Sequence, residues 1–176
     1  YLTEIEAAYL GDITGKRVCV LASGDNLLVF RFARLGAIMT SVDISQGMLN
    51  IAAERAKEID LDITFIQADV IDLHSIASES FDIVYTGGHV TLWIAKLNQF
   101  ISEAARILKP DGILMINEYH PFRYIWQETP DKLELAHNYF STGPFEVERL
   151  GGIPSFNYHW TISDYVEAML KADILL

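Results

Sequence analysis

Signals for disulfides and for membrane insertion are missing from this sequence. The chain of 176 residues has a single cysteine, Cys19, which cannot form an internal disulfide. It lies in an apolar run, where a thiol behaves as a small hydrophobe. No apolar stretch approaches the roughly 18 residues that indicate a membrane span, and no segment resembles a signal peptide. We therefore expect a reducing, cytoplasmic setting.

Basic residues are also scarce. Lys and Arg number 13 against 24 Asp and Glu, which gives a formal net charge of −11. An acidic surface repels nucleic-acid phosphates and anionic lipid, so neither nucleic acid nor a membrane is an expected partner. A neutral or cationic small molecule suits this charge better, and solubility alone is the other explanation for it. With 51% apolar residues, the chain is expected to fold as one domain over residues 1–176.

Five short apolar runs predict buried strands, at residues 16–22, 37–42, 63–68, 81–85 and 113–117. Amphipathic stretches between them predict helices over 27–35, from Ser45 to about residue 59, and over 92–108, with a turn at 109–112. Strands that alternate with helices pair in parallel, with helices on both faces of the sheet. The sequence thus predicts an α/β, Rossmann-like, doubly wound and mostly parallel sheet within a core of residues 15–118.

The pattern changes after Glu118. Residues 119–160 are rich in aromatics and are interpreted as an insertion or lid, with a hairpin formed by 145–149 and 156–160 around Gly151 and Gly152. Thr161 or Ser163 is expected to cap a last helix that runs to about residue 172. Residues 161–176 would then hold this helix and the start of a sixth strand.

Small or acidic residues follow each of the first four predicted strands. Ala22, Ser23 and Gly24 follow the first strand, and small residues let the backbone approach a ligand closely. Asp43 follows the second strand, 19 residues after Gly24, which is the spacing that brings a carboxylate to a nucleotide ribose. Asp69 follows the third strand, where it could accept from an adenine amine or simply cap a turn. Gly87 and Gly88 follow the fourth strand, where they leave room for a ligand against the backbone or form a flexible loop. Since these positions share one edge of a parallel sheet, they predict a nucleotide site.

Five segments of the core carry a family resemblance. They read VCVLASGDN, TSVDIS, FIQADVIDL, FDIVYTGGHVTLWI and AARILKPDGILMINEY. In these segments the chain resembles class I S-adenosylmethionine-dependent methyltransferases of the type 11/25 methyltransferase-domain group. The resemblance implies a sheet of seven strands, of which the sixth and seventh are missing here, since the sequence stops near residues 173–176. Either the sequence is truncated, or the edge of strand five is expected to be covered by the 145–160 hairpin or by a second copy in a homodimer.

The resemblance also implies the chemistry. S-adenosylmethionine is the implied cofactor and S-adenosylhomocysteine its product, with a small-molecule acceptor attacking the sulfonium methyl in line and no metal involved. Candidate bases are His89, His120 and His159, and a base is needed only if the acceptor arrives protonated. The implied cofactor-binding residues are Ala22, Ser23, Gly24, Asn26, Asp43, Ile44, Met48, Ala68, Asp69, Val70, Thr86 and Gly87.

The first motif departs from the family pattern. Val20 stands where the family has an acidic residue, Ala22 replaces the first glycine and Asn26 replaces the last. Asp25 is therefore a candidate for the contact with the methionine amino group. Its other explanation is an acidic residue placed at a helix N-terminus, where the helix dipole favours it.

Two alternatives remain open at the level of sequence. A nicotinamide-dependent oxidoreductase would use Asp43 equally well, but its glycine motif requires glycine where Ala22 and Leu27 stand. A non-catalytic cofactor-binding or interaction domain would explain the altered first motif.

Overall fold

The structure, a computed structural model, describes residues 2–25, 27–129, 132–148 and 154–176. Backbone contacts divide the chain into two compact units. The first, called the sheet unit below, comprises Tyr1–Gly87 and Glu103–Ile116. The second, called the hairpin unit, comprises Gly88–Ser102 and Asn117–Leu176.

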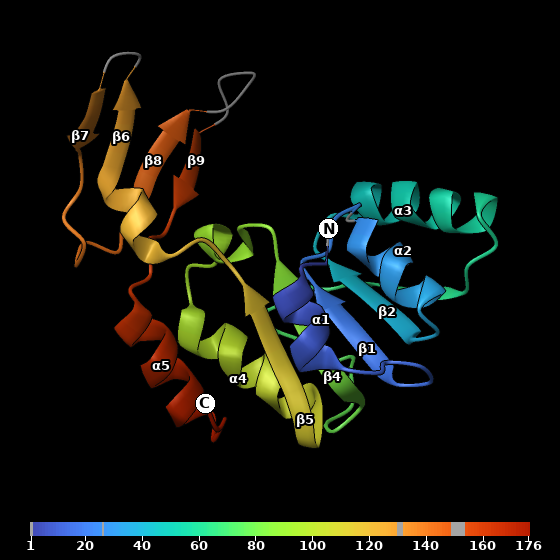
Figure 1. The fold of residues 1–176 in the computed structure, drawn as a ribbon. Helices are drawn as coiled ribbons and strands as arrows, with labels where there is room; N and C mark the ends of the chain where they lie inside the picture. Colours follow the sequence, from blue (N-terminus) through green and yellow to red (C-terminus); the bar gives the residue numbers. More distant parts are fainter. Residues whose placement is uncertain (1, 26, 130–131, 149–153) are drawn as a thin grey trace. The chain divides into compact units, whose positions relative to one another are not determined.

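The sheet unit is built on a five-stranded, mostly parallel sheet (Figure 1). Its strands are β1 (Arg17–Leu21), β2 (Ile38–Asp43), β3 (Ile63–Gln67), β4 (Phe81–Gly87) and β5 (Leu108–Asn117). They lie in the order β3-β2-β1-β4-β5, and the pairs β1–β2, β1–β4 and β2–β3 are parallel. The winding therefore reverses at β1. Open α/β sheets bind their ligands at this switch point, outside the carboxyl ends of the strands.

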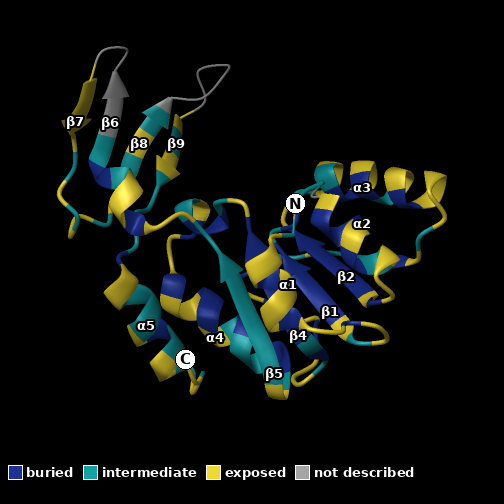
Figure 2. Cartoon of the chain, in the orientation of Figure 1, coloured by how far each residue is buried: buried dark blue, intermediate teal, exposed yellow. Residues whose placement is uncertain are grey.

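Three helices contribute to one buried cluster with the sheet. They are α1 (Glu4–Leu10), α2 (Leu27–Arg34) and α3 (Gln46–Glu58). Alternate strand residues such as Val18 and Val20 join Phe32 of α2 and Ala52 of α3 in this cluster. The intervening residues Cys19 and Leu21 are buried as well, so β1 is covered on both faces (Figure 2). This confirms the predicted α/β doubly wound fold and explains why its strands are apolar throughout.

Helix α4 (Leu97–Ile107) ends against the segment that precedes β4. The Arg106 guanidinium donates to the backbone carbonyls of Leu73 and Ile76, at 2.9 Å in each case. Glu103 accepts from the Leu73 N–H at 2.7 Å and also from the Arg106 guanidinium. These charge-assisted bonds fix the start of β4, whose residues carry the site described below.

The predicted helix 92–108 was too long at its start. The structure has a short 3₁₀ helix, η1 (Val90–Trp93), then a break before α4. Ile94 is extended, and its carbonyl accepts from the Trp160 indole N–H at 3.0 Å instead of from a later turn of helix. The turn predicted at 109–112 was also wrong, because β5 already begins at Leu108 and only Asp111 adopts a left-handed φ, of 63°.

The N-terminal helix α1 was not predicted at all. Its signal is nevertheless present, because Thr3 and Glu6 form a reciprocal capping box, with the Thr3 side chain accepting from the Glu6 N–H. The Glu6 carboxylate is buried and accepts from the Tyr85 hydroxyl at 2.7 Å. The helix is thus held to β4 by a polar contact that apolar periodicity does not reveal.

The hairpin unit holds two antiparallel hairpins and a helix. Its elements are η2 (Pro121–Ile125), β6 (Trp126–Thr129), β7 (Lys132–Leu135), β8 (Phe145–Glu148), β9 (Pro154–Asn157) and α5 (Ile162–Lys171). The β8–β9 pair confirms that a hairpin forms, but its second strand is Pro154–Asn157 and not 156–160 as predicted. Gly151 and Gly152 lie outside the described residues, and the β6–β7 pair was missed. Thr161 is the N-cap of α5, and Ser163 lies inside the helix.

The hairpin strands form sheets of their own, so among the described residues β5 remains an edge strand of the five-stranded sheet. Across the same residues, no helix combines the length and apolar character needed to cross a bilayer.

Candidate functional site

Asp43 joins the ends of three neighbouring strands. Its Oδ2 accepts from the Gly24 N–H after β1 at 2.7 Å, and its Oδ1 accepts from the Ser45 N–H at 2.8 Å. Its backbone carbonyl accepts from the Ala68 N–H after β3 at 3.1 Å. A carboxylate offers about four acceptor positions, and these two side-chain bonds leave capacity for further donors. The structure thus brings Asp43 within hydrogen-bond distance of Gly24, the pair that the spacing of 19 residues predicted to lie together.

Further hydrogen bonds continue this connection to β4. Ser23 donates its N–H to the Val42 carbonyl at 3.0 Å, and its hydroxyl lies 2.7 Å from the Ser41 hydroxyl. On the other side of β1, the Thr86 hydroxyl donates to the Leu21 carbonyl at 3.3 Å. Ser23, Ser41 and Thr86 are all buried. The ends of β1, β2, β3 and β4 therefore form one connected edge, called the strand-end rim below.

The turn after β1 keeps a left-handed backbone despite its missing glycine. Gly24 has a φ of 53° and Ala22 a φ of 48°. A Cβ at Gly24 would meet Met48 Cε at an ordinary 3.7 Å, so the backbone conformation, not crowding, favours glycine there. Ala22 adopts the same region with a side chain present, at a cost of about 1–2 kcal/mol. The shape of the turn is thus retained although the family's first glycine is not.

Two further predicted residues, Ile44 and Asp69, follow β2 and β3 at the rim. Ile44, directly after Asp43, is 65% exposed, which is unusual for a large apolar side chain beside a buried acid. Asp69 is exposed, and its Oδ1 accepts from the Ile71 N–H at 3.1 Å. The turn-capping explanation of Asp69 therefore holds for one oxygen, and Oδ2 remains able to accept from a ligand. Val70 beside it is buried.

Asp25 has a partner that the sequence did not predict. Its Oδ2 accepts from the Arg55 guanidinium of α3 at 2.6 Å. This ion pair joins the turn after β1 to the helix that follows β2. Asn26, the other candidate in this turn, lies outside the described residues.

The sheet unit's rim fits an adenosyl group on structural grounds. It presents a buried carboxylate with unused acceptor positions, an exposed apolar side chain next to it and a left-handed small-residue turn. Among the described residues, no group of three or more His, Cys, Asp or Glu side chains is placed to hold a metal ion.

The hairpin unit contains a cavity of about 1050 Å³ with mainly aromatic walls. Phe145 and Tyr124 both stack on the His159 ring, with ring centres 4.4 and 4.9 Å away, and His137 lies edge-on at 5.5 Å. Burial, with a smaller contribution from the nearby His137, lowers the pKa of His159. Burial likewise raises the pKa of Tyr124 to about 12, with the Glu118 charge adding to the effect. The walls include Tyr119, Tyr124, Trp126, Phe145, His137 and His159.

The three candidate bases have different surroundings, all within the hairpin unit. His120 accepts from the Phe122 N–H through Nδ1 at 3.2 Å, so its other nitrogen carries the proton when the ring is neutral. His159 lies in the wall of the aromatic cavity. His89 has a left-handed φ of 68° and stacks on Tyr119 with ring centres 3.9 Å apart. Its Nδ1 lies 3.7 Å from Oε2 of Glu118.

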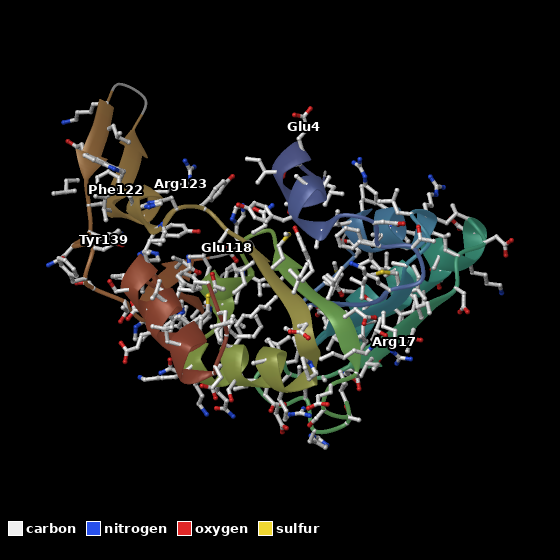
Figure 3. All side chains as sticks on the ribbon, turned by 60° about the horizontal axis from the view of Figure 1, so that its bottom comes forward. Glu4, Arg17, Glu118, Phe122, Arg123 and Tyr139 are labelled. Atoms are coloured by element: carbon white, nitrogen blue, oxygen red, sulfur yellow. The ribbon has the colours of Figure 1, made fainter. Side chains whose placement is uncertain are left out.

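Glu118 is a candidate site residue that the sequence did not identify. Its side chain is only 8% exposed, Oε1 accepts from the Thr91 N–H at 2.9 Å, and Oε2 is buried without a hydrogen-bond partner in the described part of the chain. Figure 3 labels it just beyond the end of β5. The sequence contained a signal for it, because residues directly after the strands of a parallel sheet lie where ligands bind, and Glu118 directly follows the fifth strand.

The fold defines a Rossmann-like α/β protein, and the rim at the switch point of its sheet is a candidate nucleotide-type site. The family profile described as "Methyltransferase domain" matches residues 20–116, more than half of the chain. The chain therefore belongs to the methyltransferase-domain family, which confirms the resemblance seen in its motifs.

Individual relatives agree with this assignment. The chain is 32% identical over 124 residues to a ubiquinone biosynthesis O-methyltransferase from Glaesserella parasuis, covering 66% of this chain and 52% of the relative. It is 33% identical over 117 residues to a demethylmenaquinone methyltransferase from Tropheryma whipplei, covering 66% and 47%. It thus spans about half the length of these curated relatives.

Solved structures show the same fold. An S-adenosylmethionine-dependent methyltransferase from Mesorhizobium loti superposes with a TM-score of 0.76 at 23% identity. The alignment covers 94% of this chain and 77% of that one, so it extends beyond the sheet unit.

Proposed function

We propose that this chain transfers a methyl group from S-adenosylmethionine to a hydroxylated small molecule of the quinol or phenol type. The observation that carries the proposal is the Asp43 carboxylate, held at the end of β2 by the Gly24 N–H at the switch point of the sheet. Family membership supports methyl transfer, and the names of the two relatives support a small-molecule acceptor related to quinones.

The strand-end rim supplies the groups that would hold the cofactor. Asp43 is placed to accept from the ribose hydroxyls, and exposed Ile44 offers an apolar surface to the adenine ring. Asp69 and the Val70 N–H would bond the adenine edge. The turn from Ala22 to Gly24 would lie against the methionine part. When bound, S-adenosylmethionine supplies a methyl group already activated by its sulfonium, so the protein's contribution is positioning and exclusion of water.

Ser23, Met48, Ala68, Thr86 and Gly87 complete the proposed cofactor-binding set. Ser23 and Thr86 act through the buried hydrogen bonds that fix the rim. Met48 lies beside the Gly24 position and closes the turn from the side of α3. Asn26 and Asp25 remain proposed partners of the methionine amino group.

The aromatic cavity of the hairpin unit is the proposed acceptor site. Its volume of about 1050 Å³ is at the upper end of the size range of small-molecule pockets. Aromatic walls suit a planar ring, which stacks on them at low entropic cost. Asn157 Oδ1 in its lining is buried and has no hydrogen-bond partner among the described residues, so it would accept from a hydroxyl group. A hydroxyl acceptor arrives protonated, so a base is required, and His89, His120 and His159 are the proposed candidates.

Calorimetry with S-adenosylmethionine and with NAD tests the proposal. We expect one molecule of S-adenosylmethionine to bind per chain and NAD not to bind. Transfer of isotope-labelled methyl to hydroquinone, catechol and 4-hydroxybenzoate would then be measured. Binding without transfer to any hydroxylated compound would favour a non-catalytic domain, and binding of NAD in place of S-adenosylmethionine would overturn the assignment.

A further inference from the structure

The structure contains a buried acidic side chain that the proposed function does not yet use. Oε2 of Glu118 and Nδ1 of His89 are two of three buried side-chain polar atoms without a hydrogen-bond partner in the described chain, and they face each other at 3.7 Å. An unpartnered buried carboxylate oxygen is costly, and natural structures retain few of them. Two such atoms opposite each other indicate a function.

We propose that Glu118 and His89 form a proton-accepting dyad, in which Glu118 positions the histidine and His89 Nε2 takes the proton of an acceptor hydroxyl group. This inference rests on the proposed methyl transfer. It adds a positioning residue to the site and specifies the acceptor atom as an oxygen that arrives protonated.

Glu118 is held in one orientation by its surroundings. Oε1 is fixed by the Thr91 N–H at 2.9 Å, which leaves Oε2 directed at His89. Thr91 is itself held, since its hydroxyl lies 2.6 Å from the Tyr165 hydroxyl. Burial is the main cause of the raised pKa of Tyr165, which is therefore a neutral partner. A carboxylate so fixed selects the histidine tautomer with its proton on Nδ1.

The histidine is oriented from its other side as well. Its ring stacks on Tyr119, and the Arg123 guanidinium lies 4.9 Å from the centre of the same Tyr119 ring. The His89 side chain is 39% exposed although its Nδ1 is buried, so the exposed part of the ring is the part away from Nδ1. With Nδ1 protonated toward Glu118, the free lone pair sits on Nε2.

The backbone at His89 supports a functional placement. A φ of 68° is a strained, left-handed conformation for a residue other than glycine, and such strain is concentrated at functional sites. In sequence, His89 follows β4 by two residues and Glu118 directly follows β5, the strand ends where open α/β sheets bind ligands. The distance of 3.7 Å from His89 Nδ1 to Glu118 Oε2 is longer than that of a hydrogen bond, as is common at catalytic sites before a ligand binds.

The proton balance of the step is simple. The acceptor O–H bond breaks, its electron pair stays on the oxygen, and its proton moves to Nε2 of His89. The oxygen forms a bond to the methyl carbon as the bond from that carbon to sulfur breaks, and the electron pair of the broken bond stays on sulfur. The resulting imidazolium is stabilised by the Glu118 charge. His89 later returns the proton to solvent, which removes from the site the one positive charge that the sulfonium brought in.

Two measurements test the dyad, and the first needs neither cofactor nor acceptor. Nitrogen-15 NMR of the His89 ring at pH 9, where imidazoles are neutral, reports which nitrogen carries the proton. We expect the Nδ1–H tautomer in the wild type. In Glu118→Gln the amide N–H₂ faces the ring, and the Nε2–H tautomer should appear. Glu118→Asp should restore the Nδ1–H form, at least in part.

The second measurement uses methyl transfer to whichever panel phenol is accepted. Glu118→Gln should lower kcat about 100-fold or more, with the dissociation constant for S-adenosylmethionine changed less than twofold. Glu167→Gln, an exposed acid in α5, is the matched control and should leave both values unchanged. An unchanged tautomer in Glu118→Gln, or a kcat loss below fivefold, overturns the dyad. Failure of S-adenosylmethionine to bind the wild type would instead overturn the proposed function and leave the tautomer result standing.

Discussion

The sheet unit and the hairpin unit differ in whether their buried polar side-chain atoms near the candidate site have hydrogen-bond partners. In the sheet unit, the buried polar side chains Ser23, Asp43 and Thr86 at the strand-end rim bond to backbone or to each other. In the hairpin unit, His89, Glu118 and Asn157 each keep a buried polar atom without a partner among the described residues. The buried polar side chains of the rim thus already have hydrogen-bond partners, whereas the hairpin unit holds buried polar atoms whose hydrogen bonds are not yet formed. Under the proposed function, the rim is a preformed cofactor site and the hairpin unit is an acceptor site that is completed when its ligand binds.

The largest expected effect comes from removing the carboxylate at the centre of the rim. Asp43→Ala should raise the dissociation constant for S-adenosylmethionine about 100-fold or more. The reason is that bonds to a charged acceptor contribute about 1.5–3 kcal/mol each, and 1.4 kcal/mol corresponds to tenfold in affinity. Calorimetry on both proteins measures the change.

Asp82 provides a matched control at the opposite edge of the same sheet. Its Oδ2 accepts from the Arg17 N–H at 2.8 Å, and its Oδ1 from the Lys109 ammonium at 2.7 Å, which lowers its pKa. Asp82→Ala therefore removes a comparable set of bonds and should lower the unfolding temperature while leaving the affinity for S-adenosylmethionine intact. Equal losses of affinity in the two variants would show that Asp43 acts only through stability.

The next effect concerns the cavity walls. Phe145→Ala removes a ring that stacks on His159 and should raise KM for the accepted phenol about tenfold, because an aromatic pair contributes about 0.5–1.5 kcal/mol beyond its buried area. The dissociation constant for S-adenosylmethionine should not change. Phe140→Ala, at a ring that is 81% exposed, is the control. Steady-state kinetics that show the same KM for all three proteins would place the acceptor elsewhere.

A smaller effect is expected from the turn after β1, where two exchanges should act in opposite directions. Ala22→Gly relieves a left-handed alanine and should raise the free energy of unfolding by about 1 kcal/mol, whereas Gly24→Ala imposes the same strain and should lower it by a similar amount. Urea denaturation of both variants measures the pair. If Ala22→Gly destabilises the protein, Ala22 contributes a contact that outweighs its backbone strain.

The smallest effect is a dependence of stability on pH in the hairpin unit. The pKa of His159 is lowered in the folded protein, mainly by burial. Below its ordinary value near 6.5 the unfolded chain takes up a proton that the folded chain does not, so stability falls as the pH drops from about 6.5 to the lowered pKa. Between pH 7.5 and 5.5, His159→Gln should lose less unfolding temperature than the wild type. An identical loss would contradict this origin.

The sequence predicted the two units with unequal success, and the reasons are physical. Asp43 and Gly24 were predictable because a parallel sheet brings the ends of its strands together, so that spacing along the chain translates into proximity. The hairpin β6–β7 is a local pairing that was missed. Glu118 had a signal in its place directly after β5, but its role depends on a contact between distant segments, that of Thr91 with Glu118, for which no local period exists. The sequence of helix α1 contains a capping box from which the helix could have been predicted. The helix was missed because its apolar periodicity is weak.

The most direct test of the central claim is amide NMR of the protein during titration with S-adenosylmethionine. The account predicts that the amide signals of Gly24, Ile44, Ala68 and Gly87, one from each of the four strand ends, shift together and saturate at one equivalent. The signals of Arg17 and Asp82, at the opposite edge of the sheet, should stay in place. Shifts confined to the opposite edge or to the hairpin unit, or no shifts at all, would contradict the assignment of the strand-end rim as the cofactor site.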